Sequence, residues 1–453
     1  MDMTMRRWAA VAAVGLAVIG GVRAAEIDPA AARALHERLL VLDTHLDTPA
    51  NLSRPGWKIT DRHRWEDDRS QVDLPRMSEG GLDGGFWVVY TAQGPRTPAG
   101  LATARDRALR RTVEIREMVA AHPQHFELAL RATDAARIAA KGKRVVYLSI
   151  ENAYPIGKDL SLVKTFYDLG VRMMSPAHTT HSDLADSATD PAGPEWHGLS
   201  PLGREFVAEC NRLGIVLDAS HAADSVFDQM LELSKTPIIL SHSGPRGAND
   251  HPRNIDDARI RRLAAKGGVI QINALSAYLI PTPPNPERNA AMVQLYLKYG
   301  LQPPRTARPA DAPSPVGAGA GAGWSGGAAK QTAGRGGRSS ASELGPERQE
   351  AFQRDRREIE TKFPVPQATF DDYMRHVLHA LKLVGPKHVG FGADWDGGGG
   401  VVGMRDVAAL PKITERLLRE GYSEQDLADM WGGNVLRVLR AAEEHAAQVG
   451  GER

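Results

Sequence analysis

The sequence predicts an α/β fold, a (β/α)8 barrel of the TIM type. Eight short apolar runs typical of buried strands recur along the chain, and stretches with the apolar spacing of helices separate most of them. Strands that alternate with helices form parallel sheets, and eight such units close a barrel. The alternative is an open doubly wound sheet. It would need a glycine-rich phosphate turn after its first strand, and the first run is not followed by one.

The first residues of the chain predict an export signal. Arg6 and Arg7 precede an apolar run over residues 8–19, and small residues follow as far as Ala24. We therefore expect residues 1–24 to be cleaved and the mature protein to be periplasmic. The apolar run is too short to span a bilayer, and no hydrophobic tail follows residue 445, so we expect no stable membrane anchor after cleavage.

Residues 25–450 are expected to form one domain built on the eight strands. The strands are expected at 39–45, 85–90, 145–150, 171–174, 214–218, 237–240, 268–272 and 388–392. Helices are expected at about 29–40, 101–121, 158–169, 201–213, 222–234, 256–266, 346–362, 367–384, 405–420 and 423–446. The polar stretch 51–75 follows the first strand, and we interpret it as a loop that forms a wall or lid of the site.

One segment, residues 303–343, interrupts this alternation of strands and helices. Its only large apolar residues are Val316 and Trp324, among Gly, Ala, Pro, Ser and Arg. Such a composition buries too little surface to offset its ordering entropy, which predicts a disordered insertion between the seventh and eighth strands. A locally shifted reading frame of GC-rich DNA is a second interpretation of its Gly-Ala repeat.

Composition and charge favour a small-molecule substrate. The formal net charge is +1, and Lys and Arg do not form stripes interleaved with aromatic residues, so nothing indicates nucleic-acid binding. The single cysteine, Cys210, excludes an internal disulfide and has the setting of a core residue on a helix. Any metal must then be held by nitrogen and oxygen ligands.

Polar, metal-competent side chains stand where several of the predicted strands end. They are His45, Asp47, Glu151, His221 and His242. In a barrel such residues meet at the C-terminal ends of the strands. Five ligands are too many for one catalytic zinc but suit two metals, with Glu151 bridging them. Two metals can share a hydroxide and polarise a carbonyl, which predicts hydrolysis of an amide or related bond.

Further residues are candidates for the remaining catalytic roles. Asp394 is the candidate proton shuttle, and Asp396 is its rival by spacing. His178 is a candidate to stabilise the oxyanion, whereas we interpret His181 as structural. Arg253 is a candidate to bind a substrate carboxylate, although a surface arginine is nearly as good an interpretation of its spacing.

Eight motifs follow one another along the chain in a specific order and spacing. They are Asp43-Thr44-His45-Leu46-Asp47, Gln71-Val72-Asp73-Leu74-Pro75-Arg76, Ile150-Glu151, Ala177-His178-Thr179, Asp218-Ala219-Ser220-His221, Leu240-Ser241-His242-Ser243, Arg253-Asn254-Ile255 and Gly392-Ala393-Asp394-Trp395-Asp396-Gly397. This set resembles the membrane (renal) dipeptidase family of zinc peptidases. The resemblance covers residues 35–445 apart from the insertion, and it includes a final helix beginning near Gly433.

The resemblance implies a dipeptidase that carries two Zn²⁺ per subunit. Its implied metal ligands are His45, Asp47, Glu151, His221 and His242, and its implied substrate contacts are His178, Arg253 and Asp394. The family cleaves dipeptides and tolerates a D-residue at the C-terminal position, and its members suggest a homodimer. Some members open lactams, so an amidohydrolase acting on N-acyl amino acids or lactams is the alternative. A non-catalytic binding protein would require a lost ligand, and none of the expected positions is missing.

Three features depart from the family pattern. Asn152 and Ala153 follow Glu151 where family members often have glycines. The insertion at 303–343 replaces a stretch that the family usually fills with helical sequence. The hydrophobic C-terminal tail that precedes the lipid anchor of animal members is absent.

Overall fold

The computed structural model describes residues 27–301, 303 and 344–451. The expected signal peptide, residues 1–24, lies outside the described residues, as does nearly all of the expected insertion at 303–343. The proposed cleavage and the proposed disorder therefore remain predictions.

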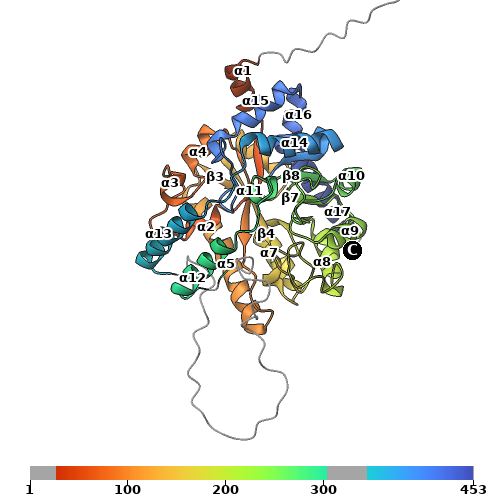
Figure 1. The fold of residues 1–453 in the computed structure, drawn as a ribbon. Coiled ribbons are helices and arrows are strands. Elements are labelled where there is room, and N and C mark those ends of the chain that lie inside the picture. Colours follow the sequence, from red (N-terminus) through yellow and green to blue (C-terminus); the bar gives the residue numbers. More distant parts are fainter. Residues whose placement is uncertain (1–26, 302, 304–343, 452–453) are drawn as a thin grey trace, which may run out of the picture.

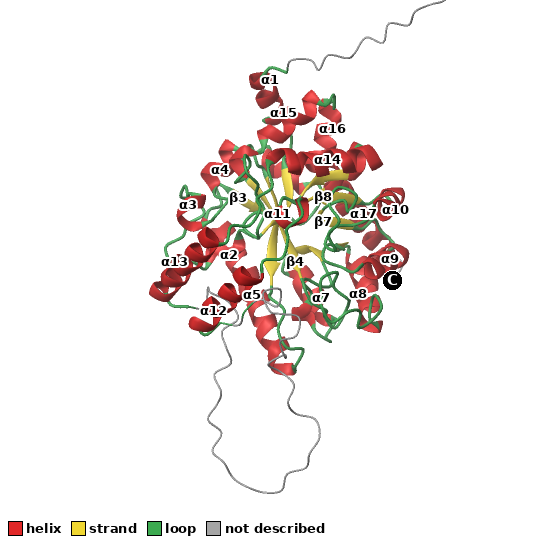
Figure 2. Ribbon diagram, viewed as in Figure 1, coloured by secondary structure: helices red, strands yellow, loops and turns green. Residues whose placement is uncertain are grey.

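Eight parallel strands form the closed barrel that the sequence predicts. They are β1 (Leu42–Leu46), β2 (Gly84–Tyr90), β4 (Arg144–Glu151), β5 (Val171–Met174), β6 (Val216–Leu217), β7 (Ile239–Ser243), β8 (Val269–Ile272) and β9 (Val389–Phe391). Neighbours in this order pair in parallel. Single parallel bridges, Asp218 to Ile239 and Leu46 to Trp395, join β6 to β7 and β9 to β1. The strands occupy the centre of the molecule and helices surround them (Figure 2).

Helices cover the outside of the barrel and connect its strands (Figure 1). They are α1 (Pro29–His36), α2 (Pro49–Leu52), α3 (Trp65–Asp68), α4 (Leu74–Glu79), α5 (Pro98–Ala121), α6 (Asp134–Ala139), α7 (Ser161–Asp168), α8 (Pro201–Leu213), α9 (Asp224–Leu233), α10 (Asp257–Ala265), α11 (Ser276–Leu279), α12 (Pro286–Lys298), α13 (Pro346–Lys362), α14 (Phe370–Val384), α15 (Pro411–Arg419), α16 (Glu424–Ala428) and α17 (Asn434–Gly451). None of the helices described has both the length and the hydropathy needed to cross a bilayer.

The structure corrects several predicted elements. An additional strand, β3 (Phe126–Leu128), pairs with β4 outside the barrel path. The stretch 51–75 is not a plain loop, because it contains α3 and the first residues of α4. The single helix expected at 423–446 is two helices, α16 and α17, joined by a π-helical turn over Asp429–Gly433. At this turn Gly432 approaches the barrel closely, since a Cβ there would lie 2.7 Å from the Leu40 carbonyl oxygen.

Apolar side chains fill the end of the barrel at which the strands begin. Early residues of the strands gather with α17 in one buried cluster, among them Leu42, Phe86, Val145, Met173, Val216, Ile239, Val269, Val435 and Leu439. Burial of such side chains stabilises the fold by roughly 1.5–3 kcal/mol each. This end of the barrel is therefore core, and the polar strand ends at the other end are left to form a site.

Helices α12 and α13 form a pair with a small core of its own. Met292, Leu295 and Tyr299 of α12 pack against Phe352 of α13 in a cluster separate from the barrel core. The two helices lie on the same side of the barrel as α3 (Figure 1).

Candidate metal centre

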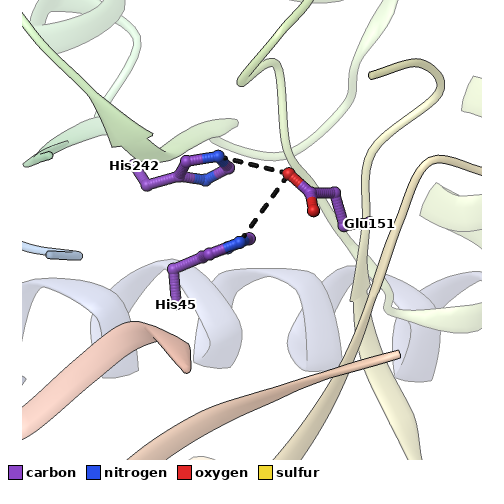
Figure 3. A group of neighbouring side chains, drawn as sticks. All are labelled: His45, Glu151 and His242. Carbon is purple, nitrogen blue, oxygen red and sulfur yellow. Dashed lines mark ion pairs between the residues drawn. The ribbon is translucent and has the colours of Figure 1, made fainter. Parts of the chain in front are cut away.

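One carboxylate oxygen, Oε1 of Glu151, is the point on which the predicted histidines converge. Glu151 is the last residue of β4 and is buried. Its Oε1 lies 3.0 Å from Nε2 of His221, 3.2 Å from Nε2 of His242 and 3.7 Å from Nε2 of His45. Figure 3 shows His45 of β1 and His242 of β7 directed toward this oxygen. The barrel thus gathers residues nearly 200 positions apart in sequence at one point.

The gathered residues fall into three overlapping groups, each able to hold a cation. The groups are His45 with Glu151 and His242, Glu151 with His178 and His221, and His45 with Asp47 and Asp394. Within each group the ligand atoms lie within 4.8 Å of one another. The structure therefore brings together all five ligands that the sequence predicts, along with His178 and Asp394.

The donor atoms of this cluster fit a divalent metal. Nε2 of His45 and Oε1 of Glu151 are buried and have no hydrogen-bond partner among the described residues. Nε2 of His221 and Nε2 of His242 lie 2.9 Å apart, a spacing that suits two lone pairs directed at one cation. A set of imidazole and carboxylate ligands is typical of zinc. Cys210, the single cysteine, is buried in α8.

The charges in the cluster favour the ligand forms of Glu151, His221 and His242. The pKa of His45 is instead raised well above its usual value, because the carboxylates of Glu151 and Asp47 outweigh its burial. Burial alone would raise the pKa of Glu151, but the neighbouring imidazoles of His178, His45, His221 and His242 hold it well below its usual value. Burial lowers the pKa of both His221 and His242 well below the usual value, and Arg253 lowers both further. An ionised Glu151 and neutral imidazoles with free lone pairs are the forms that bind metals.

Two buried aspartates hold the histidines in place through the backbone. Asp43 accepts hydrogen bonds from the N–H of His45 at 2.8 Å and from the N–H of Ala393 at 3.1 Å, which ties β1 to β9. Asp218 accepts from the N–H groups of Ser220 and Ser241, both at 2.9 Å, and from the Ser241 hydroxyl at 2.6 Å. These bonds tie the end of β6 to β7. Both aspartates belong to the sequence motifs described above, but the sequence alone indicates no role for either.

His221 and Asp394 share an unusual backbone conformation. Their φ angles are +67° and +66°, in the left-handed region that His, Asp and Asn enter more readily than most residues. Such conformations cluster at functional sites. Strand β6 is two residues long where the sequence predicts five, because Gly214 forms the left-handed C-cap of α8 and Asp218 continues the pairing only as a single bridge.

The structure separates the two candidate proton shuttles. Asp394 belongs to one of the cation-binding groups, and burial, reinforced by Asp47 and Glu151, raises its pKa well above its usual value. Asp396 instead accepts hydrogen bonds from the hydroxyl of Thr48 at 2.7 Å and the N–H of Gln71 at 2.6 Å. Asp396 therefore joins two loops, and Asp394 is the aspartate at the cluster.

Arg253 is buried beside the cluster and is not a surface residue. Its terminal nitrogens donate to the hydroxyl of Ser243 and to the carbonyl of His242, both at 2.8 Å. Its Nε is buried and has no hydrogen-bond partner in the described part of the chain. The guanidinium also lies 5.6 Å from the ring of Tyr278. Held in this way, Arg253 keeps N–H donors, Nε among them, that can bind an anionic group.

His178 and His181 lie in the same loop but have different surroundings. Nε2 of His178 lies 3.8 Å from Oε1 of Glu151. Both ring nitrogens of His181 bond within its own loop, to the N–H of Ser187 and the carbonyl of Gly193. His181 is therefore structural.

Three polar residues at the site received no role from the sequence analysis. The ring of Tyr90 meets the ring of His178 edge-on at 4.9 Å, Tyr278 faces Arg253, and Nδ2 of Asn273 lies 3.4 Å from Oδ2 of Asp394. Tyr90 ends β2 and Asn273 follows β8, so the rule that strand ends carry polar site residues could have found both.

Comparison with known proteins identifies the family. A model of the membrane dipeptidase family, peptidase family M19, matches residues 29–452. The chain belongs to this family. The protein is therefore a metallopeptidase that acts on dipeptides, and the cluster around Glu151 is its candidate metal centre.

Named relatives of this dipeptidase come from fungi and animals. Dipeptidase tcpJ of Claviceps purpurea (strain 20.1) is 27% identical over 398 residues, which cover 86% of this chain and 74% of the relative. Dipeptidase 3 of Rattus norvegicus is 25% identical over 423 residues, which cover 91% and 67% of the two chains.

Solved structures of similar fold come from bacteria. The probable dipeptidase PvdM of Pseudomonas aeruginosa superposes with a TM-score of 0.72 at 28% identity, covering 92% of this chain and 99% of that one. A metallopeptidase of Rhodobacter sphaeroides, liganded with a phosphinate mimic of the dipeptide L-Ala-D-Ala, shares the fold with a TM-score of 0.63 at 23% identity, covering 89% and 99%.

Proposed function

We propose that this dipeptidase works with two zinc ions bridged by Glu151 and that it accepts a D-residue at the C-terminal position of its substrate. The observation that carries the two-metal proposal is the position of Glu151, which belongs to two cation-binding groups at once. His45 and Asp47 would hold one ion, and His221 and His242, whose Nε2 atoms lie 2.9 Å apart, would hold the other. Such a pair of ions supplies an activated water and polarises the carbonyl to be attacked.

The surrounding residues provide the other catalytic functions. Asp394 has a raised pKa, so it is suited to accept a proton from the attacking water and to pass it to the leaving nitrogen. His178 lies beside Glu151 and donates a hydrogen bond to the developing oxyanion. Arg253 binds the free carboxylate of the substrate through the donors that its contacts with Ser243 and His242 leave available.

The metal proposal is tested by metal analysis together with activity. We expect mass spectrometry of the purified protein to find two zinc ions per chain. Exhaustive chelation should abolish dipeptide hydrolysis, and added zinc should restore it. Activity that survives complete removal of metal would exclude this mechanism, and a single zinc at full activity would exclude the bridge.

The substrate proposal is tested with a matched set of small peptides. L-Ala-L-Ala and L-Ala-D-Ala should both be hydrolysed, and the phosphinate mimic of L-Ala-D-Ala should inhibit. N-acetyl-L-Ala-L-Ala should react far more slowly, because a dipeptidase requires the free amine. Preferential hydrolysis of the acetylated compound or of a lactam would favour the amidohydrolase alternative.

We also propose that the protein is exported to the periplasm and forms a homodimer. The arginine pair and apolar run within residues 1–24 support the export, and the resemblance to the family supports the dimer. Fractionation of cells should recover the protein in the periplasm without residues 1–24, as mass spectrometry of the intact chain would show. Light scattering should give the mass of a dimer. Full-length protein in the cytoplasm, or a monomer, would contradict these proposals.

A further inference from the structure

A cleft of about 910 Å³ lies beside the metal centre, between α13 and the loops at the mouth of the barrel. Gly397–Gly400 and Leu275–Ala277 line its inner wall. Gly397 also borders the metal centre, because a Cβ on it would lie 2.1 Å from Oδ2 of Asp47 and 2.2 Å from Oδ1 of Asp394. The cleft is therefore separate from the metal centre but only one backbone segment away.

The lining of the cleft is strongly basic. Its arginines are Arg69, Arg288, Arg356, Arg357 and Arg405, and its carboxylates are Glu360 and Asp396. Asp396 is already used by Thr48 and Gln71. Glu360 accepts from Nε of Arg356 at 2.9 Å and lies 3.6 Å from Arg69. Both carboxylates of the cleft therefore already have partners, and the cleft carries an excess of positive charge.

Three of these arginines lack a carboxylate partner within the described ranges. They are Arg288, Arg357 and Arg405, and Nε of Arg288 is also buried without a hydrogen-bond partner. Residues 304–343 hold five basic and two acidic residues, so they add no net negative charge. Because like charges held close together repel, and a buried donor without a partner is costly, this arrangement favours a bound anion.

The sequence of α13 turns its charged face toward the cleft. Gln353, Arg356, Arg357, Glu360 and Thr361 line the cleft, and their spacing of three and four residues puts them on one face of the helix. The apolar Phe352 packs against α12 on another face, which fixes the rotation of α13. The basic wall is therefore built by the packing of the helix pair.

The chemistry of the walls indicates the class of ligand. Planar guanidinium groups pair with carboxylates through two parallel hydrogen bonds. Between the arginines lie the ring of Trp65, with Arg69 at 3.9 Å and Arg405 at 4.9 Å, and the apolar stretch Phe363–Pro366. Such mixed walls suit a ligand with aliphatic parts between its charges. The volume also falls in the upper part of the range for ligand sites, roughly 300–1,000 Å³, and exceeds what a dipeptide fills.

We propose that this cleft is a second binding site, for an acidic peptide longer than a dipeptide. Carboxylates of the peptide pair with Arg288, Arg357 and Arg405, and its aliphatic parts contact Trp65 and Phe363. The site is independent of the proposed catalytic mechanism, since none of the proposed metal ligands lines it.

Fluorescence anisotropy with a labelled tetraglutamate at low ionic strength, on the metal-loaded protein, tests this site. We expect Arg357→Glu and Arg288→Glu each to weaken binding at least tenfold. Arg354→Glu is the matched control, because Arg354 is on the same helix, has a 62% exposed side chain and does not line the cleft. It should change the affinity less than twofold, and labelled tetralysine should not bind. Thermal melts of each variant check folding, and the exposed Arg357 keeps the test valid if Arg288→Glu misfolds.

Three outcomes would overturn the proposal. Equal weakening by Arg354→Glu and Arg357→Glu would reduce the binding to general electrostatic attraction. Displacement of tetraglutamate by the phosphinate dipeptide mimic would place it in the catalytic site. Binding of pyrophosphate that depends on Arg357, without binding of tetraglutamate, would make the cleft a phosphate site.

Discussion

At the scale of single residues, the two aspartates near the C-terminal strand differ in what surrounds them. Asp394 lies among other acidic and metal-competent groups, and among the described residues its carboxylate has a single weak hydrogen bond, from Asn273 at 3.4 Å. Asp396 is held by short hydrogen bonds from Thr48 and Gln71. A carboxylate that must move a proton needs free lone pairs, and Asp394 has them.

Exchanging these two aspartates for asparagine should therefore give opposite phenotypes. Asp394→Asn should lower kcat by about 10²- to 10⁴-fold, the usual contribution of a general acid or base, with its zinc content unchanged. Asp396→Asn should lower the free energy of unfolding by about 1–3 kcal/mol, because it removes a buried acceptor, and should retain most of the activity. Steady-state kinetics, metal analysis and thermal melts of both variants make the comparison. A fully active Asp394→Asn would move the proton transfer to another group.

Asp218 acts on the metal site through backbone N–H groups and through the Ser241 hydroxyl, which lies 2.9 Å from Nδ1 of His242, and this too can be tested. Asp218→Ala should weaken zinc affinity by about 10- to 100-fold, since residues that orient metal ligands contribute on this scale. Competition with a chromophoric chelator measures the change. Asp224→Ala is the matched control. Asp224 begins the next helix, α9, and pairs with Arg246 and Arg259, so its loss should leave zinc affinity unaltered.

At the scale of elements, the loop after β9 is shaped by glycine. Gly397 must be small because Asp47 and Asp394 lie where its Cβ would stand. Gly399 is equally confined, with the Ala393 carbonyl oxygen 1.9 Å from its Cβ position. The glycines thus let the loop fold back on its own start and approach the metal centre.

Gly397→Ala should consequently lower activity without unfolding the barrel. Its methyl group would push Asp47 or Asp394 aside, and misplacement of a catalytic group by about 1 Å can cost about 100-fold in rate. The control is Gly345→Ala, where nothing lies within 4 Å of the new Cβ. Kinetics and circular dichroism of the two variants would show the effect. Equal activity would mean that the loop relaxes freely.

Much of this arrangement could be predicted from local sequence, and the exceptions share a cause. Glu151, His45 and His242 could be found because each closes an apolar strand, and the barrel rule then places all strand ends together. The anchoring by Asp43 and Asp218 could not be found in this way. Beyond a local N–H group two residues on, each accepts from a distant N–H group, that of Ala393 or Ser241, which comes within reach only when the barrel closes.

Errors in the predicted elements have similarly specific reasons. Strand β6 starts later than predicted because Gly214 still belongs to the end of α8, where it forms a left-handed C-cap. The helix pair α16–α17 contains a π turn where Gly432 meets Leu40, a tertiary contact. In the sequence, the basic face of α13 has the pattern of an ordinary solvated helix face. Only the packing of α13 against α12 turns this face toward a cleft.

At the scale of the whole molecule, the proposed metal ligands come from strands on different sides of the barrel. The ligands come from the ends of β1, β4 and β7 and from the turn after β6. Metal bound to the native state alone should stabilise the entire fold. At a free zinc concentration 100 times the Kd, one site adds about 2.7 kcal/mol. Differential scanning calorimetry should therefore show a lower Tm after chelation, and its recovery with zinc. An unchanged Tm would mean that the unfolded chain binds zinc equally well.

Two buried histidines away from the metal centre should make stability depend on pH. His36 bonds to Thr414 and to the carbonyl of Gly80, and His376 bonds to the carbonyl of Leu279. Burial lowers the pKa of each to about 4 from the ordinary 6.5. Between these values the unfolded chain binds more protons than the native one, so stability falls as the pH drops from 6.5 toward 4. Each histidine contributes about 3 kcal/mol to this loss.

The contribution of one histidine is isolated by a difference between two proteins. Burial raises the pKa of Asp396 to about 6, which acts in the opposite sense, so the pH dependence of the wild type alone is a sum of terms. We expect His36→Gln to differ from the wild type by a constant free energy of unfolding above pH 7. Below pH 6.5 the gap should change steadily in favour of the variant, because glutamine has no proton to bind. Denaturant titrations from pH 4.5 to 8 measure both curves, and parallel curves throughout this range would show that His36 is protonated in the native state as readily as in the unfolded one.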